Sequence, residues 1–175
     1  MKEAEKSSRQ QSCIRIGCLA VLGLGALLFI VVFVQYRYTP FNYFPAEVVE
    51  ALQTDPEATL FSINPLSDAG DSNDSLRNHR IYGKTVLSSA ADRASLVNVL
   101  TESTRGAWEG AACFDPRHAL RATGPKGTYD LVICFGCGQV HVYHPDGRKQ
   151  LVFIRASSDK YNSYLTARDV PLPDQ

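Results

Sequence analysis

The fold of this chain is decided by residues 128–135, which read TYDLVICF. β-Branched and aromatic residues fill this run, and such residues favour a pleated, largely buried strand. Turn residues lie on both sides of it, with Gly-Pro-Lys-Gly at 124–127 and Gly-Cys-Gly at 136–138. The run therefore predicts a central strand that tight turns join to both of its neighbours.

The alternation of strand and turn continues on both sides of this run. An extended segment at 111–123 precedes it, strands at 140–144 and 150–156 follow it, and a Pro-Asp-Gly turn lies at 145–147. Short connections of this kind join antiparallel neighbours. The C-terminal half of the chain is therefore predicted to form an antiparallel β-meander.

Two further strands and two or three short helices are expected around the meander. Strand patterns occupy residues 59–63 and 80–87. Helical patterns start at Pro45, at Ser89 and at Asp159, and each contains apolar residues at helical spacing. Helices that lie outside a run of strands favour an α+β fold with one antiparallel sheet, which we predict for residues 45–175.

An uninterrupted apolar run lies near the N-terminus, at residues 16–34 (IGCLAVLGLGALLFIVVFV). As a helix this run would be roughly 28 Å long, about the hydrocarbon thickness of a bilayer. A cleaved signal peptide has a shorter apolar core that ends in small residues, whereas this run ends in Phe33 and Val34. We therefore expect a retained transmembrane anchor over residues 14–35, preceded by a short cytoplasmic tail at residues 1–13.

The residues on the two sides of the anchor predict its orientation. Four basic residues precede the apolar run and one follows it, namely Lys2, Lys6, Arg9 and Arg15 against Arg37. Basic residues stay on the cytoplasmic side, so we expect the N-terminus in the cytoplasm and the C-terminal domain outside. Five aromatic side chains lie within residues 36–44, which predicts an aromatic juxtamembrane segment at the outer interface.

Composition narrows the classes of function. The chain carries 18 basic and 18 acidic side chains, of which 13 and 16 lie from residue 40 onward. A nucleic-acid-binding domain normally has a net basic face, so the partners expected are the lipid bilayer and an envelope or membrane protein rather than nucleic acid. The sequence contains no P-loop, dinucleotide-binding, zinc-protease or serine-hydrolase motif, and it does not predict an enzyme.

Three cysteines and a histidine form the main candidate site. The fragment 134–138 (CFGCG) resembles the C-x-x-C-G knuckle of zinc-ribbon proteins, although a second C-x-x-C pair is missing. A hairpin closed at residues 124–127 would place Cys113 next to Cys137 and His118 next to Cys134. One hypothesis is therefore a zinc site with four ligands, Cys113, His118, Cys134 and Cys137.

Two other interpretations of the cysteines stay open. Oxidising conditions outside the membrane favour a disulfide, from Cys113 to Cys137 or from Cys113 to Cys134. All three cysteines could instead be small buried apolar residues. A thioredoxin-like redox pair is not expected, because its first cysteine lies at a helix N-terminus, whereas this pair lies between two strands.

Three hypotheses about function follow from these features of the sequence. The first is a single-pass membrane-anchored protein whose extracytoplasmic domain binds a partner or supports an envelope assembly, without catalysis. The alternative is a membrane-tethered metal-binding (zinc-type) or thiol/disulfide protein that uses Cys113, Cys134 and Cys137. An enzyme with Cys113 as nucleophile, His118 as base and Asp115 or Asp130 orienting the imidazole comes third.

Overall fold

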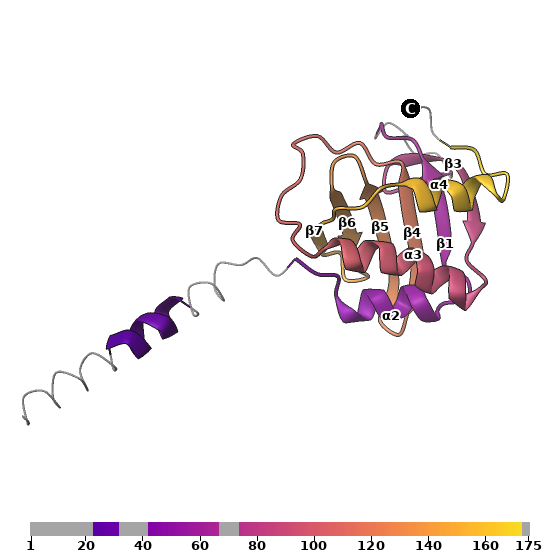
Figure 1. Ribbon diagram of the computed structural model, residues 1–175. Helices are drawn as coiled ribbons and strands as arrows, with labels where there is room; N and C mark the ends of the chain where they lie inside the picture. Colours follow the sequence, from indigo (N-terminus) through magenta and orange to yellow (C-terminus); the bar gives the residue numbers. More distant parts are fainter. Residues whose placement is uncertain (1–22, 32–41, 67–73, 173–175) are drawn as a thin grey trace, which may run out of the picture. The chain divides into compact units, whose positions relative to one another are not determined.

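The computed structural model describes residues 23–31, 42–66 and 74–172 (Figure 1). The chain divides into two units, Met1–Phe41 and Asn42–Gln175. In the first unit, residues 23–31 are helical and expose a series of apolar side chains, Leu24, Leu27, Leu28, Phe29, Ile30 and Val31. Among the described residues no helix has the length and apolar character that a membrane span requires. The rest of the expected anchor and the whole cytoplasmic tail lie outside the described residues.

The second unit is an α+β domain built on one seven-stranded antiparallel sheet that curls into a half-barrel. Its strands lie in the order β2-β3-β1-β4-β5-β6-β7. The bounds are β1 Thr59–Ile63, β2 Ser75–Leu76, β3 His79–Val86, β4 His118–Gly124, β5 Gly127–Cys134, β6 Gln139–Tyr143 and β7 Lys149–Phe153. The last four strands are consecutive neighbours, which confirms the predicted meander. The two-residue edge strand β2 was not predicted.

Three helices cover one face of this sheet (Figure 1). They are α2 Ala46–Thr54, α3 Ala90–Ser103 and α4 Asp159–Thr166. Helix α3 begins as the sequence predicts, because the Ser89 side chain accepts a hydrogen bond from the backbone N–H of Asp92. The core between the helices and the sheet contains buried side chains from all three helices and from the strands, among them Val48, Leu96, Leu120, Leu131 and Tyr161.

The domain begins at Asn42, three residues before the start expected from the sequence. The Asn42 side chain donates hydrogen bonds to three backbone carbonyls and accepts one from the N–H of Phe153 in β7. Phe44, which the sequence placed in the aromatic juxtamembrane segment, is buried in the core of the domain. Of that segment Tyr43 is exposed, and residues 36–41 lie outside the described residues.

The β4–β5 hairpin sets the position of the candidate site. Gly124 pairs with Gly127 at its tip, and Gly127 has a φ of 120°, a conformation that a residue with a side chain rarely adopts. Antiparallel pairing from this tip brings His118 opposite Ile133. This is the register that closure at residues 124–127 predicts.

A buried carboxylate holds together the sheet face opposite the helices. Asp130 in β5 lies within 2.7 Å of Arg77 Nε and within 2.6 Å of Arg121 Nε, and its side chain is 1% exposed. Hydrogen bonding to Asp130 raises the pKa of Arg121. The Arg77 guanidinium also lies over the Tyr143 ring, 4.6 Å from the centroid. These contacts tie the turn between β2 and β3 to the centre of the sheet.

We predict that Asp130→Asn lowers the free energy of unfolding by about 2 kcal/mol, since a buried acceptor of charged hydrogen bonds loses its charge. Urea unfolding followed by circular dichroism measures the change. Asp146→Asn is the matched control, because the Asp146–Arg148 pair has similar geometry (2.6 Å) but both side chains are more than half exposed. Equal losses for the two variants would contradict the role assigned to Asp130.

Candidate functional site

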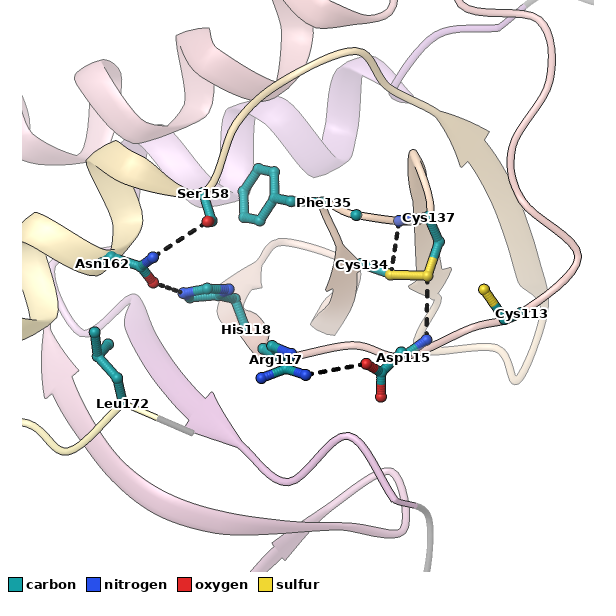
Figure 2. A pocket seen from close by; sticks show the side chains of 11 residues that line it. Cys113, Asp115, Arg117, His118, Cys134, Phe135, Cys137, Ser158, Asn162 and Leu172 are labelled. Carbon is teal, nitrogen blue, oxygen red and sulfur yellow. Dashed lines mark hydrogen bonds and ion pairs between the residues drawn. A yellow bond between two sulfur atoms is a disulfide. The ribbon is translucent and has the colours of Figure 1, made fainter. Parts of the chain in front are cut away.

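A pocket of about 410 Å³ lies beside the N-terminal end of β4 and the C-terminal end of β5 (Figure 2). The segment before β4, the turn after β5 and helix α4 complete its wall. All four residues of the predicted metal site line this pocket, namely Cys113, His118, Cys134 and Cys137. The β4–β5 hairpin, the turn after it and the loop before β4 therefore bring together the residues that the sequence singled out.

Cys134 and Cys137 are joined by a disulfide in the wall of the pocket (Figure 2). Cys134 ends β5, and Cys137 lies in the turn that leads to β6. Gly138 completes this turn with a φ of 66°, and its N–H donates to the carbonyl of Phe135. The turn holds the two cysteine Cα atoms 5.2 Å apart, within the span of a disulfide.

This pairing corrects the disulfide predicted from the sequence, which joined Cys113 to Cys137 or to Cys134. Cys113 is instead an exposed free thiol. The physical reason is the break at Pro116, since ladder pairing of β4 with β5 starts only at His118. The segment that carries Cys113 is therefore a loop rather than a continuation of the strand. Cys134 and Cys137 are also largely buried, at 2% and 4% exposed.

Each sulfur of the disulfide accepts a hydrogen bond from a backbone N–H. The N–H of Cys137 donates to Cys134 Sγ at 3.0 Å, and the N–H of Asp115 donates to Cys137 Sγ at 3.2 Å. Donors in these positions stabilise a thiolate once the disulfide is reduced. The cysteine pair lies at the end of one strand and in the turn to the next, as the sequence predicts. The turn after β5 supplies one N–H donor, and the loop before β4 supplies the other.

His118 is a buried imidazole at the inner edge of the pocket, 2% exposed. Its Nε2–H donates to Asn162 Oδ1 in α4 at 2.8 Å. Its ring lies edge-on to Phe135 and Tyr161, with centroids 5.4 Å and 5.8 Å away. Burial lowers the pKa of His118 to about 4; the bond to Asn162 opposes this shift, and the charge of Arg117 adds to it. The imidazole is therefore neutral at physiological pH.

The carboxylates near His118 in sequence are engaged elsewhere. Asp115 forms an ion pair with Arg117 at 3.2 Å at the edge of the pocket. Asp130 binds Arg77 and Arg121 on the other face of the sheet. The Nε2 atom of His118 thus bonds an amide oxygen rather than either carboxylate that the Cys113–His118 enzyme hypothesis requires.

The zinc hypothesis concerns the same pocket. Within residues 23–31, 42–66 and 74–172, no three His, Cys, Asp or Glu side chains are grouped in a way that could hold a metal ion. Two of the four predicted ligands, Cys134 and Cys137, are bonded to each other. Zinc binding therefore stays a prediction for the protein in which this disulfide has been reduced.

Helix α4 and the residue before it contribute two side chains that the sequence did not indicate, Asn162 and Ser158. Asn162 bonds His118 across 44 positions of the chain, and its amide group donates to Ser158 Oγ at 3.1 Å. The sequence predicts a helix at residues 159–167, but no motif links that helix to the start of β4. Only the packing of α4 on the sheet reveals the pair.

Comparisons of the chain with protein families, with curated proteins and with solved structures found no match. The function must therefore be inferred from the pocket and from the chemistry of the residues around it.

We predict that the folded state loses stability as the pH falls from about 6.5 to 4. His118 in the unfolded chain takes up a proton near its ordinary pKa of 6.5, whereas the folded protein resists protonation down to about 4. The loss attributable to His118 is at most roughly 3 kcal/mol. The measurement is the unfolding free energy against pH, in the wild type and in His118→Gln.

His141→Gln is the matched variant for that measurement. Burial and the charges of Lys149 and His79 also lower the pKa of His141 to about 4, but this residue lies outside the pocket and stacks on Phe114. Each substitution is expected to remove part of the pH dependence. If His118→Gln kept the full slope between pH 6.5 and 4, the neutral buried state of His118 would be refuted.

Proposed function

We propose that this protein is a single-pass membrane protein, with its N-terminus in the cytoplasm, whose outer domain binds a segment of an envelope or membrane protein in the pocket beside the Cys134–Cys137 disulfide. The apolar run at residues 16–34 and the excess of basic residues before it support the anchor and its orientation. The observation that carries the binding function is the pocket itself, whose volume of about 410 Å³ lies in the range typical of small-molecule and cofactor sites.

The lining of the pocket suits a polypeptide segment with both apolar and polar groups. Phe135 and Leu172 supply apolar surface, and the Asp115–Arg117 pair lies at the pocket edge. Next to the pocket, residues 108–113 are all exposed, and Trp108 is 62% exposed. Tryptophan is enriched among the residues that dominate binding energy at protein interfaces, so Trp108 extends the docking surface beyond the pocket.

The second candidate function is thiol–disulfide exchange, and a different observation favours it. Both sulfurs of the disulfide belong to residues that line the pocket, and each accepts a backbone N–H. A partner segment that carries cysteines would therefore bind next to the disulfide, with the exposed Cys113 thiol in the same pocket wall. Zinc binding by the reduced set of Cys113, His118, Cys134 and Cys137 is the remaining alternative, for which metal content after reduction is the test.

Photocrosslinking in host membranes tests the binding function. A photoreactive phenylalanine analogue at position 108 is expected to give one discrete adduct with a membrane or envelope protein, whereas the same analogue at position 151, exposed on β7, is expected to give none. Phe135→Ala should weaken the adduct by roughly tenfold, because it removes an aromatic contact inside the pocket. Absence of an adduct at position 108, or equal yields at both positions, would contradict the proposal.

Labelling in the same cells tests on which side of the membrane the domain lies. With Cys13→Ser and Cys18→Ser in place, Cys113 is the remaining thiol outside the disulfide, and its side chain is exposed. A membrane-impermeant maleimide should label it in intact cells. Labelling that appears only after the membrane is permeabilised would place the domain on the other side and refute the proposed orientation.

A further inference from the structure

We propose that Cys113 is the exchange thiol of a three-cysteine relay, in which it attacks Cys137, releases Cys134, and then presents the new Cys113–Cys137 disulfide to the thiols of a partner protein. The inference rests on the second candidate function, thiol–disulfide exchange, and assigns its route and its substrate class. The substrate is a pair of protein thiols that becomes oxidised to a disulfide.

The first support is the attachment of the Cys113 loop to Cys137. The N–H of Ala111 donates to the carbonyl of Cys137 at 2.9 Å, and the N–H of Asp115 donates to Cys137 Sγ at 3.2 Å. Cys113 lies midway between these two attachment points. Gly110 passes so close that a Cβ added to it would lie 2.8 Å from the carbonyl oxygen of Cys137. The loop is therefore held against one cysteine of the pair.

The side-chain arrangement supports the same order of attack. Figure 2 shows the Cys113 side chain on the Cys137 side of the disulfide, with Cys134 on the far side. Thiol–disulfide exchange proceeds by attack of a thiolate on one sulfur with departure of the other. In this arrangement Cys137 is the sulfur attacked and Cys134 is the leaving group.

The leaving group is also the better stabilised of the two. Cys134 Sγ accepts the N–H of Cys137 at 3.0 Å, within a turn that does not depend on the Cys113 loop. A thiolate formed at Cys134 keeps this donor, and a stabilised leaving thiolate speeds exchange. Attack on Cys134 would instead expel the thiolate of Cys137, whose donor is the N–H of Asp115 in the attacking loop itself.

The low exposure of the disulfide explains why exchange with a partner protein needs a third cysteine. Cys134 and Cys137 are 2% and 4% exposed, so the thiol of a folded partner protein has little access to them. Cys113 is exposed in a loop whose residues 108–113 are all exposed. Moving the disulfide to Cys113 transfers the reactive bond from the buried pair to the surface.

The steps balance in atoms and electrons. Cys113 loses its proton and bonds to Cys137 Sγ; the Cys134–Cys137 bond breaks, and Cys134 leaves as a thiolate that takes up a proton. A partner thiolate then bonds to Cys113 Sγ and expels Cys137 as a thiolate. The second partner thiolate attacks the partner's own sulfur and releases Cys113. Overall the partner loses two electrons and two protons and gains a disulfide, and Cys134 and Cys137 become thiols.

This relay gives a physical meaning to the pairing expected from the sequence. The sequence predicts Cys113 beside Cys137, and in the structure the loop that carries Cys113 is hydrogen-bonded to Cys137, whereas the disulfide joins Cys137 to Cys134. In the relay both pairings occur, one as the resting state and the other as the state that reacts with the partner.

Peptide mapping of matched variants tests the first step, using the full chain in detergent with Cys13→Ser and Cys18→Ser. After mild oxidation, Cys134→Ser is expected to contain the Cys113–Cys137 disulfide, and Cys137→Ser is expected to leave both Cys113 and Cys134 open to alkylation. A second sample is the chain with all three domain cysteines intact, whose free thiols are alkylated rapidly while exchange proceeds. Peptide mapping of this sample should detect the Cys113–Cys137 disulfide. This result does not depend on the folding of either variant. Absence of this disulfide from both samples would overturn the relay.

A rate measurement separates the relay from the exchange function on which it rests. The oxidised chain is mixed with a synthetic peptide that carries two reduced cysteines, and the release of thiols at Cys134 and Cys137 is followed by alkylation and mass spectrometry. Cys113→Ser is expected to slow this release by about tenfold or more. Equal rates with and without Cys113 would overturn the relay and leave exchange by the buried pair intact. No exchange by the chain with all three cysteines would overturn the exchange function itself.

Discussion

The antiparallel pairing of β4 with β5 fixes which side chains face the helices and which face the other side of the sheet. The turn at Gly124 and Gly127 closes this hairpin, and a slip of one residue would move each side chain of a strand to the opposite face. In the observed register Arg121 faces Asp130 on the open face, and His118 faces Ile133 on the helix face. The same pairing that satisfies a buried carboxylate thus places the imidazole beside the disulfide.

Much of this arrangement could be predicted because it is encoded locally. The turn residues at 124–127, the β-prone run at 128–135 and the hydroxyl cap at Ser89 each act over a few positions, and the structure confirms all three. The proximity of His118 to Cys134 also follows from local information, since the hairpin tip sets the register for the whole pair of strands.

What could not be predicted depends on contacts between distant parts of the chain. Asn162 reaches His118 only because α4 packs over the sheet, and the sequence around residue 162 contains no sign of that contact. The choice of Cys134 as partner for Cys137 depends on the shape of one turn and on the break in pairing before His118. Phe44 looks like an interfacial aromatic residue in the sequence, yet the core of the domain has room for its ring.

The pocket wall holds a Cys134–Cys137 disulfide beside a free Cys113, and peptide mapping of the unreduced protein can show both. Trypsin places both bonded cysteines in one peptide, residues 127–148, and Cys113 in another, residues 106–117. After alkylation without reduction, we expect a 127–148 peptide lighter by two hydrogen atoms than its reduced form, and an alkylated 106–117 peptide. Two results would contradict this pairing. One is a disulfide between the 106–117 and 127–148 peptides in most of the resting protein, and the other is alkylation of all three cysteines.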